Sequence, residues 1–177
     1  MYGLTIAISI LICTLVAEYL AKKENKNTDI LWGSVFYTIV SGVIGARIYH
    51  VIDRWDYYEL FPTRIFYLWN GGLGIIGGII LGGSALYIYL YMKKQDVLSW
   101  MDLGALVAPI GQALGRWGNV FNNELIPLAY YEMALDWILF VTLILVYKKR
   151  ASRPKGLMLS MYLAGYALIR TILHPLR

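Results

Sequence analysis

GQALGRWGNVFNNE, residues 111–124, places strongly polar side chains between two apolar segments. Arg116 and Glu124 bound a cluster that also contains Asn119, Asn122 and Asn123. The flanking runs, residues 98–115 and 129–147, are apolar enough to enter a bilayer. An ionisable side chain at membrane depth costs at least about 2.5–3.5 kcal/mol on insertion scales. A polar cluster beside such segments is therefore a candidate functional site.

The composition of the chain indicates a membrane protein. Of its 177 residues, 59% are apolar and 15% are charged, and the mean hydropathy is +0.57. A soluble domain of this length cannot bury so much apolar surface. We therefore predict an all-α, polytopic membrane helical bundle that forms a single integral membrane domain over residues 1–177.

Apolar runs of about 20 residues, the length that spans a bilayer, recur along the chain. They predict about six transmembrane helices, at residues 3–21, 30–52, 71–92, 98–115, 129–147 and 156–173. The fourth is the weakest candidate because it is short and contains Pro109, so we expect it to be kinked or to enter the membrane only part-way.

Basic residues predict the orientation. All lysines fall in three alternating loops: Lys22, Lys23 and Lys26; Lys93 and Lys94; Lys148, Lys149 and Lys155. Cytoplasmic loops are enriched in basic residues, so these loops are expected inside and both termini outside. The net charge of +5 therefore indicates topology, and no basic run interleaved with aromatics predicts nucleic-acid binding.

Arginines dominate the opposite ends of the predicted helices. Arginine grips phosphate through two parallel hydrogen bonds, which favours Arg47, Arg116 and Arg170 as functional residues. For Arg54, Arg64 and Arg177, headgroup contact by snorkelling is an equal alternative. Glu124 is expected to pair with Arg116 or with another outer arginine.

The glycine run NGGLGIIGGIILGG predicts two features. Gly78 and Gly82, four residues apart, favour close packing of helices. Residues 71–74, with Gly71, Gly72 and Gly74, are expected to begin a helix, where free backbone N–H groups are placed to receive an anionic headgroup.

At the polar cluster of residues 115–124 the sequence resembles the bacterial prolipoprotein diacylglyceryl transferases. GRWGNVFNNE is similar to their signature Gly-Arg-x-Gly-Asn-Phe-x-Asn-x-Glu, with Val120 in place of the phenylalanine. Further resemblances follow in the family order along nearly the whole chain: YGL at Tyr2, GARIYHV with Arg47 and Tyr49, GGLGIIGG from Gly71, MDLGALVAPIGQALGR, IPLAYYE ending in Tyr131 and Glu132, and GYALIR ending in Arg170.

The resemblance implies transfer of the diacylglyceryl group of phosphatidylglycerol to the lipobox cysteine of a preprolipoprotein signal peptide. A thioether forms and glycerol phosphate leaves, without cofactor or metal. The location implied is the bacterial cytoplasmic (inner) membrane, with the site toward the outer leaflet. Arg116, Glu124 and Arg170 are the expected catalytic residues. Substrate binding is expected from Tyr2, Arg47, Tyr49, Gly71, Gly72, Asn119, Asn122, Tyr131 and Glu132.

The sequence departs from the family pattern in three places, which concern the base for the substrate thiol and the head region outside the membrane. Ile76 stands where the family has a histidine, so the base is open among His50, His174, Glu124 and unaided ionisation of the thiol. Ile126 replaces the histidine of the His-Pro motif, and the outer head region before that motif is missing. His174 stands where the family usually carries a glutamate.

Two other functions remain open. Ile76 supports a catalytically silent relative that binds phospholipid or lipoprotein signal helices. A small transporter or channel needs a polar path through the bilayer midplane, whereas the ionisable residues here cluster near the outer boundary.

Overall fold

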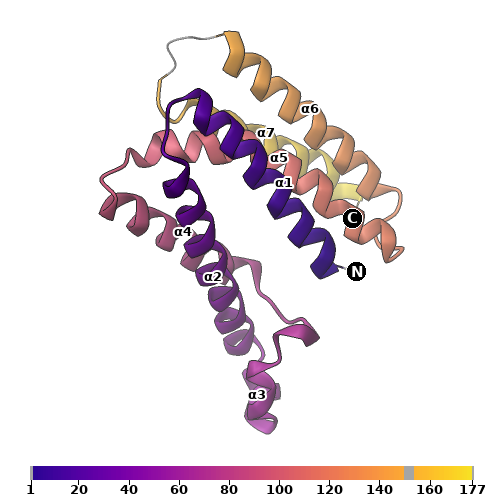
Figure 1. The fold of residues 1–177 in the computed structure, drawn as a ribbon. Helices are drawn as coiled ribbons and strands as arrows, with labels where there is room; N and C mark the ends of the chain where they lie inside the picture. Colours follow the sequence, from indigo (N-terminus) through magenta and orange to yellow (C-terminus); the bar gives the residue numbers. More distant parts are fainter. Residues whose placement is uncertain (1, 150–153, 177) are drawn as a thin grey trace. The chain divides into compact units, whose positions relative to one another are not determined.

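The computed structural model describes residues 2–149 and 154–176, and every regular element in this part of the chain is helical (Figure 1). The α-helices are α1 (Tyr2–Lys23), α2 (Thr28–Asp53), α3 (Trp55–Leu60), α4 (Ile75–Met92), α5 (Val97–Phe121), α6 (Leu128–Lys149) and α7 (Leu157–Leu173). Short 3-10 turns are η1 (Pro62–Phe66), η2 (Leu68–Asn70) and η3 (His174–Leu176). The all-α prediction is confirmed.

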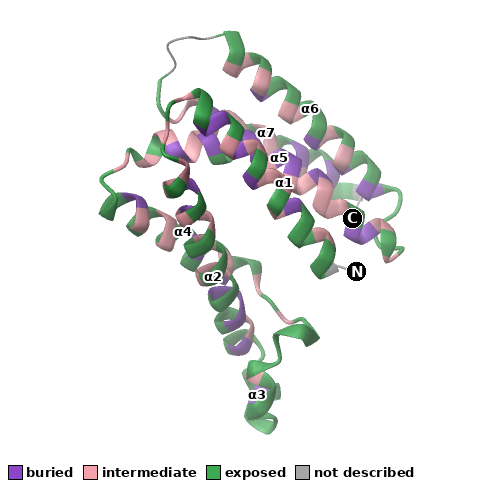
Figure 2. Ribbon diagram, viewed as in Figure 1, coloured by how far each residue is buried: buried purple, intermediate pink, exposed green. Residues whose placement is uncertain are grey.

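Five helices, α1, α2, α4, α5 and α6, are long and apolar enough to cross a membrane. The sixth predicted span corresponds to α7, an apolar but shorter helix of 17 residues. Large apolar side chains such as Leu4, Ile79 and Tyr91 are exposed on these helices, and exposed residues cover much of α1, α2, α4 and α6 (Figure 2). Such surfaces suit contact with lipid. The chain is a multi-pass membrane protein.

The fourth predicted span corresponds to α5, which is longer than expected but has the lowest mean hydropathy, 1.4, of the five candidate spans. α5 runs continuously for 25 residues and contains Pro109. It is also the most buried of the five long helices, with 44% of its apolar window buried against at most 28% in the others. The reason is its packing against α1, α6 and α7. Pro109 and the small residues Ala105 and Ala113 are buried in α5, and a proline is tolerated inside a membrane helix that packs against other helices.

The described chain forms two compact units, one of residues 1–28 and 97–177 and the other of residues 29–96. The single-domain prediction stays a prediction. In the first unit, α5 contacts α1, α6 and α7. Asp102 of α5 accepts hydrogen bonds from the backbone N–H groups of Gly156 (2.8 Å) and Leu159 (2.9 Å). It thereby satisfies orphan donors at the start of α7 and fixes that helix against α5.

The second unit is built on close contact between α2 and α4. A Cβ added at Gly45 would meet the backbone of Gly77, and one added at Gly82 would lie 3.1 Å from the carbonyl oxygen of Thr38. Small residues allow this approach, as the sequence predicted. α4 begins at Ile75, however, so the expectation that Gly71 and Gly72 begin the helix was wrong. Gly71 and Gly72 have positive φ angles, +79° and +75°. A right-handed helix does not contain such angles, so these two residues lie outside α4.

Candidate active site

The buried carboxylate of Glu132 lies between two arginines. Glu132 Oε2 is 2.6 Å from Arg116 Nε, and Glu132 Oε1 is 3.4 Å from Arg170 Nη1. The side chain of Glu132 is 3% exposed, whereas Arg116 is 24% and Arg170 37% exposed. A carboxylate buried in this way needs a counter-charge, and here two guanidinium groups provide it.

The order of the helices brings these three residues together. Arg116 lies near the end of α5 and Glu132 near the start of α6, and only residues 122–127 connect the two helices. Arg170 lies in the last turn of α7. Because α5, α6 and α7 contact one another, the three side chains meet at one end of the first unit. The site is therefore a product of packing between three helices.

Other predicted residues of the signature surround this ion-pair cluster. Asn119 is buried in α5, and its carbonyl oxygen accepts a hydrogen bond from the Glu124 N–H at 2.8 Å. Asn122 is half-buried in the turn that follows, where Glu124 is exposed, and Tyr131 of α6 is also exposed. The structure pairs Arg116 with Glu132, whereas the sequence favoured Glu124. The catalytic role of Glu124 stays a prediction.

Asp136 was missed by the sequence analysis. It lies one turn beyond Glu132 on α6 and is buried at 3% exposure. It is within electrostatic reach of Arg116 and Glu132. The signal that identifies it is an acidic residue four positions after another one inside an apolar helix, which places both on one helix face.

Arg47, in the second unit, holds a loop. It is 7% exposed, and its Nε and terminal nitrogens donate to backbone carbonyls of the segment before α4. The acceptors are the carbonyl oxygens of Ile65 (2.8 Å), Gly71 (2.8 Å), Gly72 (2.9 Å), Tyr67 (3.3 Å) and Arg64. In this structure the guanidinium therefore fastens residues 64–72 to α2.

The remaining predicted binding residues of the second unit lie beside Arg47. A Cβ at Gly72 would come within 2.7 Å of His50 Nε2 and 2.8 Å of Arg47 Nη1. Gly71 and Gly72 present carbonyl oxygens to Arg47, whereas the sequence analysis expected their N–H groups to face a headgroup. Tyr49 packs against Gly74 and Gly77. Tyr2 lies at the start of α1, and its side chain is outside the described residues.

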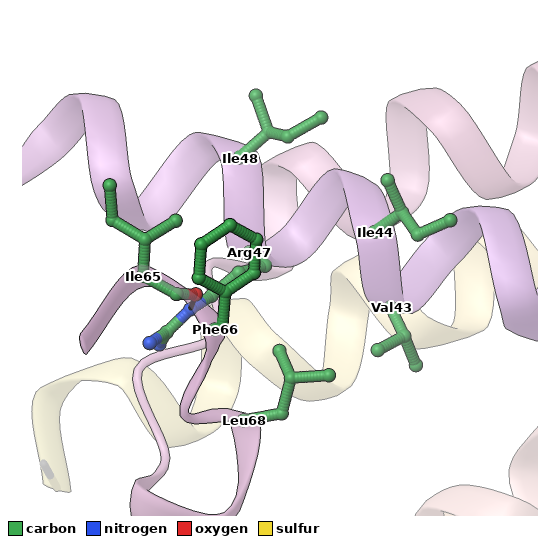
Figure 3. A pocket seen from close by; sticks show the side chains of 7 residues that line it. All are labelled: Val43, Ile44, Arg47, Ile48, Ile65, Phe66 and Leu68. Carbon is green, nitrogen blue, oxygen red and sulfur yellow. Dashed lines mark hydrogen bonds between the residues drawn. The ribbon is translucent and has the colours of Figure 1, made fainter. Parts of the chain in front are cut away.

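An apolar pocket of about 280 Å³ lies between α2 and this loop (Figure 3). Arg47 and six apolar side chains line it: Val43, Ile44, Ile48, Ile65, Phe66 and Leu68. Because the guanidinium of Arg47 is occupied by carbonyl groups, the pocket offers an apolar surface rather than a charged one. Within the described residues, no group of three or more His, Cys, Asp or Glu side chains is placed to hold a metal ion.

Comparison with known proteins identifies the family. The profile described as prolipoprotein diacylglyceryl transferase matches residues 1–177. The chain belongs to the prolipoprotein diacylglyceryl transferase family. Similar proteins named phosphatidylglycerol–prolipoprotein diacylglyceryl transferase occur in Trichormus variabilis (33% identical, covering 99% of this chain and 74% of the relative), Streptococcus equi subsp. zooepidemicus (32%, 97% and 78%) and Fervidobacterium nodosum (34%, 99% and 70%).

Three of the stretches that resemble prolipoprotein diacylglyceryl transferases contribute one charge each to the cluster. The signature GRWGNVFNNE provides Arg116, IPLAYYE provides Glu132 and GYALIR provides Arg170. These residues are distant in sequence but form one set of ion pairs. These three blocks, which the sequence analysis matched separately, therefore form one site in the first unit.

Proposed function

We propose that this chain transfers the diacylglyceryl group of phosphatidylglycerol to the lipobox cysteine thiol of a preprolipoprotein. The product is a thioether, and the leaving group is glycerol phosphate. Family membership and the names of the relatives support the reaction class. The observation that carries the proposal for this chain is the pair of arginines, Arg116 and Arg170, arranged around one buried carboxylate.

The arginines of the cluster suit a phosphate group. Two guanidinium groups share the one carboxylate within ion-pair distance, Glu132, and the buried Asp136 lies within electrostatic reach of Arg116. Arg116 approaches Glu132 through Nε, and its guanidinium carries two further terminal nitrogens with N–H donors. Those nitrogens are suited to two oxygens of one phosphate. Both arginines are also more exposed than Glu132, so a lipid headgroup reaches them first.

In the proposed reaction the thiol sulfur forms a bond with the glyceryl carbon while the carbon–oxygen bond to phosphate breaks. The phosphate gains negative charge as this bond breaks, and Arg116 and Arg170 stabilise that charge in place. Asn119 and Asn122 are assigned to headgroup or glycerol oxygens, because both lie within two turns of Arg116. Glu124 is assigned to orienting an arginine or to proton balance.

The remaining assignments belong to the same proposal. Tyr2, Tyr49, Tyr131, Gly71 and Gly72 are assigned to substrate contact, and Arg47 acts on the substrate through the loop that it holds. The partners are phosphatidylglycerol and a signal peptide with a lipobox cysteine. We place the protein in the bacterial cytoplasmic membrane with its site toward the outer leaflet.

A catalytically silent relative that binds phospholipid or lipoprotein signal helices is the second candidate. The observation that favours it is Ile76, an isoleucine in α4 that carries no ionisable group. The arginine cluster suits headgroup binding as well as catalysis, so activity distinguishes the two candidates.

The first test is a transfer assay with purified protein, phosphatidylglycerol and a synthetic lipobox peptide, read by mass spectrometry. The wild type is expected to add a diacylglyceryl group, and Arg116→Ala is expected to lower the rate about 100-fold or more, as for the loss of a donor to a developing oxyanion. Arg54→Ala is the matched control, because the Arg54 side chain is 70% exposed and pairs with Asp53. No mass gain with wild type, while lipid still binds in an Arg116-dependent way, would favour the silent relative.

A further inference from the structure

Three buried acceptor atoms in the first unit lack a hydrogen-bond partner within the described residues, and one of them, Glu132 Oε2, is held by the ion pair with Arg116. The other two are Asp136 Oδ1 on α6 and Gln112 Oε1 on α5. A buried polar atom left unpaired costs about 1–3 kcal/mol, so each such atom in a native structure calls for an explanation. Asp136 Oδ1 and Gln112 Oε1 are both acceptors, so what each lacks is a hydrogen-bond donor.

These atoms belong to a polar layer deeper than the Glu132 ion pairs. Gln112 precedes Arg116 by one turn of α5, and Asp136 follows Glu132 by one turn of α6. Gln112 Nε2 donates to the hydroxyl of Tyr162 on α7 at 2.8 Å. Asp136 acts electrostatically on Tyr162 as well. The charged and titratable groups around this layer are Arg116 from α5, Glu132 from α6, and Tyr162, Tyr166 and Arg170 from α7.

The two carboxylates of the site differ in what their oxygens contact. Each oxygen of Glu132 lies within ion-pair distance of a guanidinium group, even though Oε2 has no partner with hydrogen-bond geometry. Asp136 Oδ1 has no hydrogen-bond donor within the described residues, although Arg116 is within electrostatic reach. A carboxylate oxygen that is buried and lacks a donor is suited to receive a proton from a substrate.

We infer that Asp136 receives the proton that the substrate thiol loses during transfer. This inference rests on the proposed transferase function and supplies the proton acceptor that Ile76 cannot provide. Asp136 is buried one turn beyond Glu132 on α6 and within electrostatic reach of Arg116, and as the acceptor of the thiol proton it acts as the general base of the step.

The step balances in atoms and charge. The sulfur–carbon bond forms as the carbon–oxygen bond breaks, and the bonding electrons of the latter leave with the phosphate oxygen. The thiol proton moves to Asp136, and the phosphate changes from a singly charged diester to a doubly charged monoester. Loss of the Asp136 charge offsets the gain at the phosphate, so the charge of the whole cluster is unchanged. The proton leaves with the product or to water.

The test compares Asp136→Asn with the wild type on two lipobox peptides, one with cysteine and one with selenocysteine. Asparagine keeps the size of the side chain and adds no buried charge, so the variant is expected to fold. On the cysteine peptide we expect the rate to fall about 100-fold or more, the usual contribution of general acid–base catalysis. On the selenocysteine peptide, which is ionised at neutral pH, we expect most of the rate to return. Asp136→Glu is expected to restore part of the rate on cysteine.

Three results would overturn the inference. An equal loss on both peptides would show that Asp136 only supports the structure, and no loss on cysteine would show that another group takes the proton. If the wild type modifies neither peptide, the transferase proposal fails and the inference falls with it. Binding of phosphatidylglycerol vesicles to Asp136→Asn, expected to match the wild type, separates a lost proton acceptor from a misfolded site.

Discussion

At the scale of single residues, Glu132 is the link between α5, α6 and α7. Replacing it with glutamine keeps its shape but removes the carboxylate that both Arg116 and Arg170 contact. Removing one partner of a buried ion pair typically costs about 3–5 kcal/mol, and the partial exposure of both arginines places this case at the lower end. We therefore expect the free energy of unfolding of Glu132→Gln in detergent to fall by roughly 3 kcal/mol, measured by denaturant titration.

Glu59→Gln is the control, because Glu59 is exposed on α3 and distant in sequence from the ion-pair cluster. Surface substitutions usually change stability by less than about 0.5 kcal/mol, so little change is expected. Equal stability of the two variants would mean that the ion pairs with Glu132 contribute nothing to the packing of the three helices.

Residue types at the site were predictable from sequence, but their pairing was not. Arg116 and Arg170 stand out because arginine opposes the charge rule at the outer ends of helices. The choice of Glu132 over Glu124 as the partner of Arg116 depends on how α5 turns into α6, which no local pattern encodes. Asp136 escaped notice for a similar reason, since its burial follows only from the packing of three helices.

At the scale of elements, Arg47 fastens the segment between α3 and α4 to α2. Five backbone carbonyls accept hydrogen bonds from its guanidinium. Lysine has three donors, so Arg47→Lys leaves at least two carbonyls without a partner, at about 1 kcal/mol each. The segment is expected to open roughly tenfold to thirtyfold more often. Limited trypsin digestion, which cuts after Arg64, is expected to speed up accordingly.

The control for this digestion is Arg54→Lys, since the exposed Arg54 makes no contact with the carbonyls of this segment. If Arg47→Lys weakens binding of phosphatidylglycerol while trypsin cuts at the wild-type rate, Arg47 contacts the lipid directly instead of holding the loop. That result would restore the role that the sequence analysis gave to this arginine.

The apolar runs in the sequence predicted where the helices lie, but they did not predict two of the helix ends. The fourth apolar run ends at residue 115, but α5 continues through Pro109 to Phe121, and its packing against three helices offsets the intrinsic cost of an interior proline. Gly71 and Gly72 suggested a helix start, but the carbonyls of both turn toward Arg47 instead. In each case a contact distant in sequence decided the local conformation.

At the scale of the whole molecule, the first unit separates lysines from the arginine cluster. Lys26 Nζ donates to the carbonyl oxygen of Ser99 at the start of α5, and Arg116 lies near the opposite end of that helix. Lys148 and Lys149 likewise end α6, whereas Glu132 lies near its start. The two ends of this unit therefore carry the two kinds of basic residue. Under the positive-inside rule the lysine end faces the cytoplasm and the ion-pair cluster faces outward.

Single-cysteine labelling in intact cells tests this orientation. In a Cys13→Ser background, Asn123→Cys lies in the exposed turn beside the cluster, and Lys148→Cys lies exposed at the end of α6. A membrane-impermeant maleimide is expected to label position 123 from outside and position 148 only after the membrane is opened, because a multi-pass chain fixes each loop on one side. The reverse pattern would place the arginine cluster in the cytoplasm. The cluster would then face away from the compartment in which we place the thiol substrate, and the proposed transfer at the outer leaflet would be untenable.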